Sequence, residues 1–477
     1  MIKAKIYLII ALSGFCLIIA SCKIPKIVQS ELNKTMPTFY DHTRDSINTA
    51  NTPWKSFFNN PYLVNLIDTA LKNNQELNVT LQEIEQAKND IRFTKGLLLP
   101  SVSVGLGAGV EKIGRYTSQG AGDASADITP GKRVPDALTN ITGAAYASWE
   151  VDIWKKIHNA KKAAIMRYLS TVEGKNFVQT NLVAEVANSY YELLAFDNQK
   201  AIVEQSIELQ KNALEILKVQ KQAARVTELA VKKFEAEVLN SQSLRYNILQ
   251  QITETENRIN FLLGRYPQEI PRDKDSFMNL MPQSINVGIP SQLLANRPDI
   301  KQAELNLTAA KLDVKIARAE FYPSLDISAA LGLQAFKASY LTKLPESMLY
   351  SLAGNLVGPL INRNGIKAEF FNANSRQLQA LYNYQLTVLN AYLEVSTQLS
   401  NIDNLGKSYD LKSKEVDALT ESINISNDLF KSARADYLEV LLTQRDALSS
   451  KLELIETKRL QMNSVVNIYQ ELGGGIK

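Results

Sequence analysis

Residues that build most catalytic and metal sites are scarce in this sequence. Two cysteines and two histidines occur among 477 residues, without the spacing of metal ligands or of a nucleophile and its base. His42 and His158 lie far apart, so we expect each to be a surface or interface residue. The net charge of +4 is small for this length, which argues against nucleic-acid binding. We therefore expect no enzyme, no metal site and no nucleic-acid partner.

Long apolar runs are also scarce. Lys3 and Lys5 precede an apolar run at 6–20, and small residues then lead to Cys22, which is the order of a secretory signal peptide. The run is short for a transmembrane helix, which needs about 20 apolar residues. No comparable run follows, so a membrane-crossing form of this chain would have to be a closed β-barrel, which pairs every backbone polar group.

The end of this leader resembles the bacterial lipobox. Residues 19–22 read Ile-Ala-Ser-Cys, an order in which cleavage before the cysteine exposes it to acylation. We expect residues 1–21 to be removed and Cys22 to carry a covalent lipid, with no other cofactor. Lys23 stands where an inner-membrane retention signal usually has aspartate, which favours the outer membrane. The alternative is an ordinary signal peptide with an incidental cysteine.

Four segments alternate apolar and small or polar residues with a period of two. The first, SVSVGLGAGV at 101–110, has the length of a membrane-spanning strand, about 9–11 residues, whose faces alternate between lipid and lumen. The others lie at 141–153, 324–333 and, more weakly, 348–360. A half-buried strand of a soluble sandwich would explain any one of them. Four such segments, arranged in two pairs, favour strands of a membrane barrel. The apolar residues of each strand would then face lipid.

An internal repeat relates these pairs of strands. Pro100-Ser101 matches Pro323-Ser324 at an offset of 223 residues, whereas Leu263-Gly264 matches Leu472-Gly473 at an offset of 209. The offset changes because the connection at 111–138 is longer than the one at 334–347. The first connection is rich in Gly, Ser, Asp and Pro and is predicted to be a loop. Each copy should therefore read helix, strand, loop, strand, long helix, turn, helix.

The long helices carry the signature of coiled-coil packing. From Val388 to Phe430, apolar residues recur at the core positions of a heptad repeat, and few of these positions are polar. A helix from about 157 to 223 would be roughly 100 Å long at 1.5 Å per residue. The following helix would return to about residue 264. Hairpins of this height beside four membrane strands predict a tube rather than an enzyme.

In order and spacing, the chain resembles the TolC-type outer-membrane factors of tripartite efflux pumps, in the lipoprotein branch called NodT-like. The residues that carry the resemblance are the lipobox at Cys22, Trp54-Lys55-Ser56-Phe57-Phe58, Trp149-Glu150-Val151-Asp152-Ile153-Trp154, Asn296-Arg297-Pro298-Asp299-Ile300, Phe321-Tyr322-Pro323-Ser324-Leu325 and Leu472-Gly473-Gly474-Gly475. It covers nearly the whole chain.

The resemblance implies a mainly α-helical fold with a membrane β-barrel. Four strands per chain would complete a trimeric twelve-stranded barrel, continued by a coiled-coil tunnel in the periplasm. The implied partners are two further copies of the chain, a periplasmic adaptor, an inner-membrane pump and outer-membrane lipid. The expected division of the chain is a signal peptide at 1–21, a lipidated equatorial segment at 22–71, a first repeat at 72–264, an equatorial linker at 265–295 and a second repeat at 296–477.

The family closes its tunnel at the periplasmic tip, near the two helix turns. Glu439 occupies the acidic position of the family's pattern there, and Asp436 lies one turn before it. In the first turn Ala230 stands at that position, which leaves Glu228 as the nearest carboxylate. Ala224 replaces a usual turn glycine, as does Ala433. We expect Glu439, Asp436 and Glu228 to form the gate, the alternative being solvated surface charges.

The expected function is that of the outer-membrane duct of an efflux system, which carries drugs or other small toxic compounds out of the cell. Within the family, the alternatives are type I protein secretion and metal-ion export. Outside it, the alternative is a non-conducting structural lipoprotein.

Overall fold

The computed structural model describes residues 37–40, 47–274, 277–359, 361, 363–432 and 434–476. No helix in these ranges is both long enough and apolar enough to cross a membrane. The described residues form two compact units. The first comprises 86–168 and 305–381, and the second comprises 37–40, 47–85, 169–304 and 382–476 with the gaps given above.

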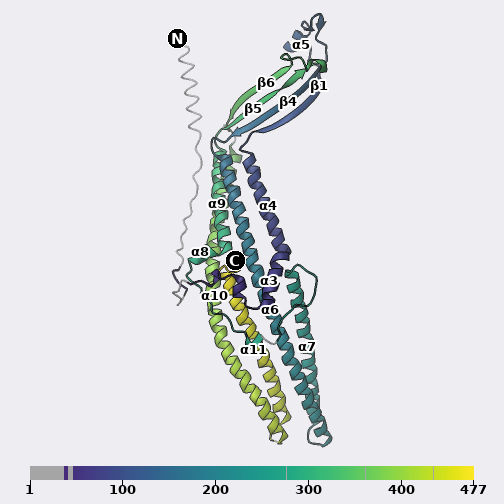
Figure 1. The fold of residues 1–477 in the computed structure, drawn as a ribbon, viewed down its shortest axis with the longest axis vertical. Coiled ribbons are helices and arrows are strands. Elements are labelled where there is room, and N and C mark those ends of the chain that lie inside the picture. Colours follow the sequence, from purple (N-terminus) through teal and green to yellow (C-terminus); the bar gives the residue numbers. More distant parts are fainter. Residues whose placement is uncertain are drawn as a thin grey trace. The chain divides into compact units, whose positions relative to one another are not determined.

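The first unit is built on one antiparallel sheet in the order β1-β4-β5-β6, whose four strands lie side by side in Figure 1. Its strands are β1 (Ser101–Glu111), β4 (Leu138–Val151), β5 (Ser324–Ala335) and β6 (Met348–Val357). The four strands predicted from the period of two are therefore confirmed, with ends that differ by up to three residues. β4 begins earlier than predicted and β6 ends earlier.

The register of the sheet aligns the predicted parities. Val104 pairs with Ala145, Ala145 with Leu331, and Leu331 with Tyr350. Directly opposed residues share one face of a sheet. The apolar parities of all four strands therefore meet on the same face, and the small and polar parities meet on the other.

The connection after β1 is more ordered than its composition predicts. It holds α5 (Ser118–Asp123) and the two-stranded sheet of β2 (Asp127–Thr129) and β3 (Lys132–Arg133). Thr117 caps α5, since its side chain accepts from the backbone N–H of Gly120. The prediction of a simple loop at 111–138 was wrong here, because local capping and hairpin bonds order a Gly- and Ser-rich segment.

Helices at the ends of the strands are tied to them by aromatic side chains. Trp154 donates from its indole nitrogen to the backbone oxygen of Pro323 at 2.7 Å and stacks on Tyr322 with ring centroids 4.7 Å apart. Phe321, the chain neighbour of Tyr322, belongs to a small core with Val314, Ala317, Phe370 and Ala373. These contacts fix the chain direction where strand becomes helix.

The second unit consists of helical hairpins with a covering layer of short elements. Its long helices are α6 (Lys156–Gln222) with α7 (Glu228–Leu262), and α10 (Asn364–Lys431) with α11 (Tyr437–Glu471). The other helices are η1 (Thr49–Asn51), α2 (Trp54–Phe57), α3 (Pro61–Asn73), α4 (Gln75–Gly96), η2 (Phe277–Asn279), α8 (Gln292–Asn296) and α9 (Pro298–Ala319), while η3 (Ala338–Tyr340) follows β5 in the first unit. α4, α6, α9 and α10 contribute residues to both units.

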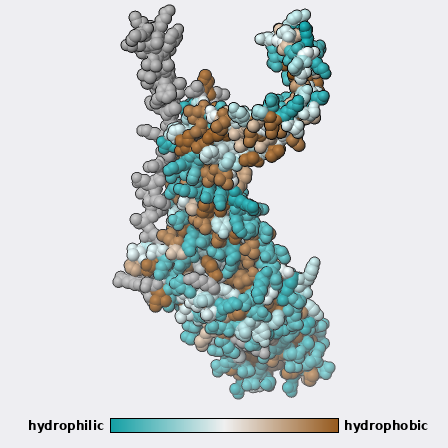
Figure 2. Space-filling model, turned by 45° about the horizontal axis from the view of Figure 1, so that its top comes forward, coloured by the Kyte–Doolittle hydropathy of each residue, from teal (hydrophilic) through white to brown (hydrophobic). Residues whose placement is uncertain are grey.

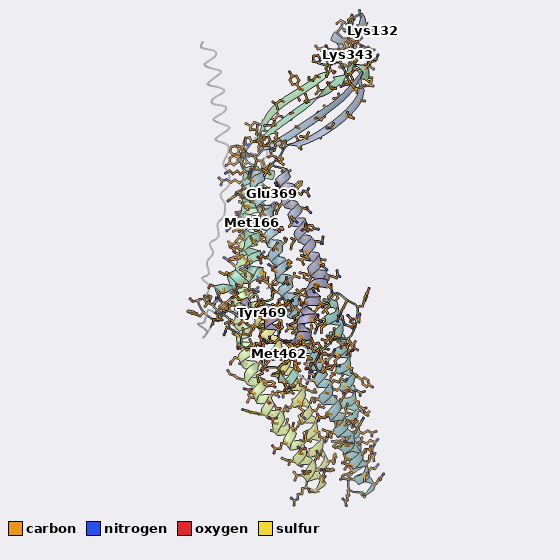
Figure 3. All side chains as sticks on the ribbon, in the orientation of Figure 1. Lys132, Met166, Lys343, Glu369, Met462 and Tyr469 are labelled. Carbon is orange, nitrogen blue, oxygen red and sulfur yellow. The ribbon has the colours of Figure 1, made fainter. Side chains whose placement is uncertain are left out.

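The main core of the second unit joins the covering layer to α11. Phe57 stacks on Tyr469 with ring centroids 3.9 Å apart, and the Tyr469 hydroxyl donates to the backbone oxygen of Thr52 at 2.6 Å. Tyr469 is labelled in Figure 3. Burial of such large rings accounts for much of the stability of this region, at about 1.5–3 kcal/mol for each large apolar side chain.

The segment between the two repeats is held by a buried ion cluster. Arg272 donates through Nη2 to Asp197 at 3.1 Å and through Nη1 to Glu256 at 2.6 Å. Its side chain is 3% exposed and that of Asp197 is 6% exposed. A buried guanidinium needs such partners, so this contact fixes the segment against α6 and α7.

Both repeats close at equivalent points. The side chain of Asn74 donates to the backbone oxygen of Leu262 at 3.0 Å, and Arg297, at the 223-residue offset, donates to that of Glu471 at 3.1 Å. The glycine after each return helix has a positive φ, 64° at Gly264 and 90° at Gly473. Each of these closing bonds therefore joins a residue related to its counterpart by the offset of 223 with one related by the offset of 209. The expected domain boundaries remain a prediction.

Candidate channel wall and tip

The sheet exposes an apolar face. On β1, Val104 is 78% exposed and Leu106 is 88% exposed, and on β6 Tyr350 is 82% exposed. Apolar side chains are visible at the surface along the strands in Figure 2. A soluble monomer seldom exposes a patch of this extent, so this face is suited to contact with lipid.

The opposite face of the sheet carries polar and small side chains. The hydroxyls of Ser101 and Ser148 lie 2.7 Å apart, and Gln334 donates to Asn140 at 2.9 Å. Glu150 lies directly opposite Asp326 in the register. Lys156 contacts the Glu150 carboxylate at 2.6 Å. These groups are compatible with a water-filled space.

The sheet is open at both edges. Within the part of the chain that the structure describes, β1 pairs with β4 alone and β6 pairs with β5 alone. Each outer edge therefore presents a row of unpaired backbone N–H and C=O groups. In lipid, such groups would each cost several kcal/mol, so a single copy does not provide a finished membrane wall.

The first predicted gate residue, Glu228, follows a strained turn. Ala224 has φ of 56°, the left-handed conformation that favours glycine. The N–H of Arg225 bonds the Gln220 oxygen at 2.9 Å and closes the end of α6. Glu228 begins α7 and forms an ion pair with Lys221, so its carboxylate links the two helices of its own hairpin.

The second turn shares one backbone bond with the first but carries different side chains. The N–H of Arg434 bonds the Leu429 oxygen at 2.8 Å, the counterpart of the bond made by Arg225. Asp436 is the N-cap residue of α11 but its side chain makes no capping bond, and Glu439 lies in the first turn. Both are exposed, and no ion pair involves either among the described residues.

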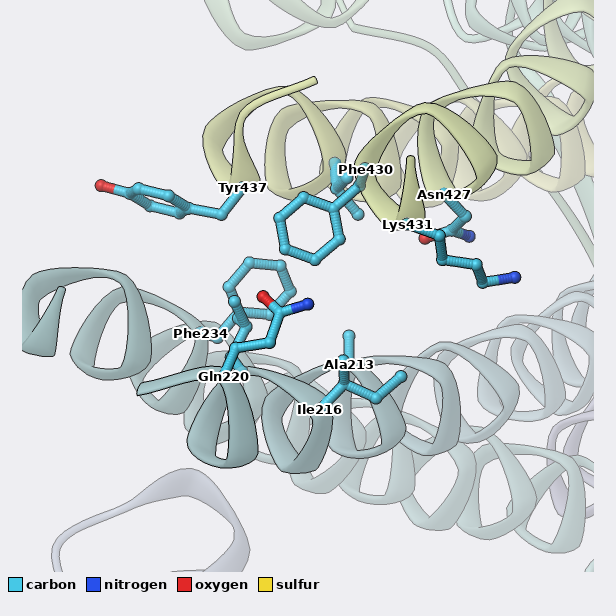
Figure 4. A pocket seen from close by; sticks show the side chains of 10 residues that line it. Ala213, Ile216, Gln220, Phe234, Asn427, Phe430, Lys431 and Tyr437 are labelled. Atoms are coloured by element: carbon cyan, nitrogen blue, oxygen red, sulfur yellow. The ribbon is translucent and has the colours of Figure 1, made fainter. Parts of the chain in front are cut away.

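The two hairpins pack together behind these turns. Leu217 and Phe234 of the first hairpin share an apolar cluster with Val440 of the second, which Phe430 and Tyr437 complete. A cavity of about 50 Å³ remains between them (Figure 4). Ala230, at the position equivalent to Glu439, is fully buried.

The two predicted site assignments, the lipidated cysteine and the gate carboxylates, both stay predictions. Cys22 lies outside the described residues. The structure places Asp436 and Glu439 together at the start of α11 and places Glu228 in the first hairpin, paired with Lys221. The gate role of these three residues stays a prediction.

Sequence reasoning missed the charged cluster around Arg297. Its partners Glu394 and Glu471 lie 97 and 174 residues further along the chain. The alignment of the two repeats could have indicated this cluster. It places the charged residues Arg297 and Glu471 where the first repeat has the uncharged Asn74 and Leu262.

Comparisons with known proteins agree with one another over most of the chain. Residues 66–265 and 289–474 match the family described as outer membrane efflux protein. The pyoverdine export outer membrane protein OpmQ of Pseudomonas aeruginosa is 28% identical over 423 residues, which cover 88% of this chain and 87% of OpmQ. The cation efflux system protein CusC of Escherichia coli is 25% identical over 431 residues, covering 90% of this chain and 89% of CusC.

A solved structure has the same fold. The open state of the MtrE outer membrane channel of Neisseria gonorrhoeae superimposes with a TM-score of 0.82 at 20% identity, covering 95% of this chain and 98% of that chain.

Proposed function

Because the chain belongs to the outer membrane efflux protein family and is the outer-membrane channel of an efflux pump, we propose that three copies assemble into one conduit with a twelve-stranded barrel. The observation that supports this proposal most directly is the four-stranded sheet, which has one apolar face, one polar face and two open edges. As in other members of this family, the protein is a channel in the outer membrane and not an enzyme.

The strand count supports closure between copies. The four strands run alternately up and down, so β6 of one copy and β1 of the next can pair as antiparallel neighbours. A barrel of about eight strands, from two copies, would be filled by its own side chains. Twelve strands leave room for a lumen lined by the Ser, Gly and Thr face. The apolar face then meets lipid all round.

The helices support assembly independently. In the second unit, Tyr382, Leu386, Leu389 and Leu393 of α10 are between 42% and 56% exposed. Their spacing of four, three and four residues places them on one stripe of the helix. An apolar stripe of this kind suits burial against a neighbouring copy.

Anchoring and partners follow from the same assignment. Cys22 would carry the lipid that fixes the mature N-terminus to the outer membrane. The hairpin tips would meet a periplasmic adaptor and, through it, the inner-membrane pump. Glu439, Asp436 and Glu228 would control opening of the tip, where threefold symmetry would turn each into a ring of carboxylates.

The cargo we propose is small toxic compounds or drugs. Relatives named for pyoverdine export and for cation efflux have similar chains, which supports a wall that tolerates different cargo. The pump and adaptor would then select the substrate. Metal-ion export stays the alternative that the similarity to CusC supports.

Two measurements on the purified full-length protein test this proposal. Native mass spectrometry in detergent should give the mass of three chains, each acylated at Cys22. Planar bilayers should show ion-conducting channels. A monomer or dimer, or a trimer that never conducts, would contradict the proposal.

A further inference from the structure

At the end of the second repeat, two carboxylates bind one guanidinium, and the carboxyl group of Glu471 lies close to them. Arg297, between α8 and α9, donates to Asp299 through Nη2 at 2.6 Å and to Glu394 of α10 through Nη1 at 2.7 Å. The same Nη1 donates to the backbone oxygen of Glu471, the last residue of α11. The cluster therefore joins three helices, and its carboxyl groups outnumber its cations.

The side chain of Glu471 is the member of this cluster with the fewest bonds. Its Oε2 is buried, and among the described residues it has no hydrogen-bond partner. The Gln398 side chain of α10 lies near the carboxyl group. The C-terminal end of α11 also carries partial negative charge, which disfavours an ionised carboxylate there. A proton on Glu471 removes this cost.

We propose that Glu471 acts as a proton-dependent lock between α11 and the turn that joins α8 to α9. In the protonated form the end of α11 stays packed on the Arg297 cluster. In the ionised form a buried negative charge faces Glu394, and the contact between the helix end and the turn loosens. The first repeat has Leu262 and Asn74 in the places of Glu471 and Arg297, so it has no such lock.

The groups facing this carboxyl come from every element packed on it. α10 contributes Glu394, and the α8–α9 turn contributes Arg297 and Asp299. From α6, the neutral Asn181 accepts from Gln470 at 2.7 Å. The phenol of Tyr40, which burial keeps neutral by raising its pKa, lies near Arg297.

Burial, aided by the Glu394 carboxylate, raises the pKa of Glu471 to about 7, although Gln398 and Arg297 oppose the rise. A carboxyl with a raised pKa in the folded state stabilises that state below its ordinary pKa and loses this contribution as the pH rises through about 7. Between pH 5.5 and 8.5 the local opening equilibrium should therefore increase on the order of 30-fold.

Hydrogen–deuterium exchange of the full-length protein in detergent tests the lock. Wild type and Glu471→Gln are compared at the same pH, so that the pH dependence of chemical exchange cancels. The opening of residues 466–476 and 292–300 in wild type, relative to that in the variant, should rise on the order of 30-fold from pH 5.5 to pH 8.5, because only wild type has the ionisable group.

Controls make the result specific. Glu185→Gln changes the residue of the first repeat equivalent to Glu394 and should leave the response to pH unchanged. Glu394→Gln removes the repelling charge and should move the transition to lower pH, which tests the lock even if Glu471→Gln folds poorly. The same ratio of opening between wild type and Glu471→Gln at both pH values, or an unmoved transition in Glu394→Gln, would overturn the lock. Exchange does not depend on conduction, so failure of the channel proposal would be seen separately.

Discussion

In the first repeat the amide of Asn74 bonds the end of the return helix, and in the second the guanidinium of Arg297 does so. The amide needs no counter-charge, whereas the guanidinium is accompanied by Glu394 and Asp299. A similar contrast occurs at the tips, where Lys221 and Glu228 pair in the first hairpin. The two repeats thus share the bond to the backbone at the end of the return helix but differ in the charges around it. Changes of pH and salt should therefore affect the stability of the two repeats differently.

Breaking the shared closure should have the largest effect. A Cβ at Gly264 would lie 2.4 Å from the Asn73 oxygen, and one at Gly473 would lie 2.7 Å from the Asn296 oxygen. Both glycines also have left-handed φ, where any other residue costs about 1–2 kcal/mol before the clash is counted. Gly264→Ala and Gly473→Ala should each lower the thermal unfolding midpoint of the purified protein by several degrees.

Gly406 in α10 provides the control, since a Cβ there meets no atom within 4 Å. Gly406→Ala should raise stability by about 0.5–1 kcal/mol. Similar midpoints for all three variants would contradict the closure argument.

A second contrast lies between the two faces of the sheet. Leu106→Arg places a charge on the apolar face, at a cost of about 2–4 kcal/mol at the bilayer midplane. Gly107→Ser changes the opposite face, where a Cβ has nothing within 4 Å. The yield of assembled protein in the outer membrane should fall for Leu106→Arg and stay level for Gly107→Ser. Equal yields would show that the faces are assigned incorrectly.

The strained turn of the first hairpin predicts a smaller effect of opposite sign. Ala224→Gly should relieve a left-handed alanine and stabilise the tip by about 1 kcal/mol. Exchange at residues 219–229 should slow, while exchange at the second turn should stay as in wild type. Faster exchange would indicate that the added freedom of glycine in the unfolded chain outweighs the strain.

The smallest effect on stability is expected for the exposed carboxylates of the second turn. Removing both in Asp436→Ala/Glu439→Ala should change stability by less than about 1 kcal/mol. If three copies place these groups around one axis, single-channel conductance and block by divalent cations should both change. Unchanged conductance and block would assign them to the solvated surface.

Much of the fold could be read from local patterns. The period of two in SVSVGLGAGV predicted both the strand and its apolar face, because each strand position faces a fixed side. The heptads after Val388 predicted the long helices for the same reason. The short helix and hairpin after β1 escaped prediction, because Gly and Ser favour no single structure until capping bonds form.

Local patterns in the sequence specified what depends on neighbouring residues: the two strand faces, the long helices and the repeat. Only the tertiary structure decided the long-range charge contacts. Arg272 meets Asp197 across 75 residues, and Arg297 meets Glu394 across 97. No local pattern specifies such partners, because a buried charge is satisfied by any oppositely charged group that the fold brings within reach. The raised pKa of Glu471 belongs to the same class, since burial and Glu394 together create it.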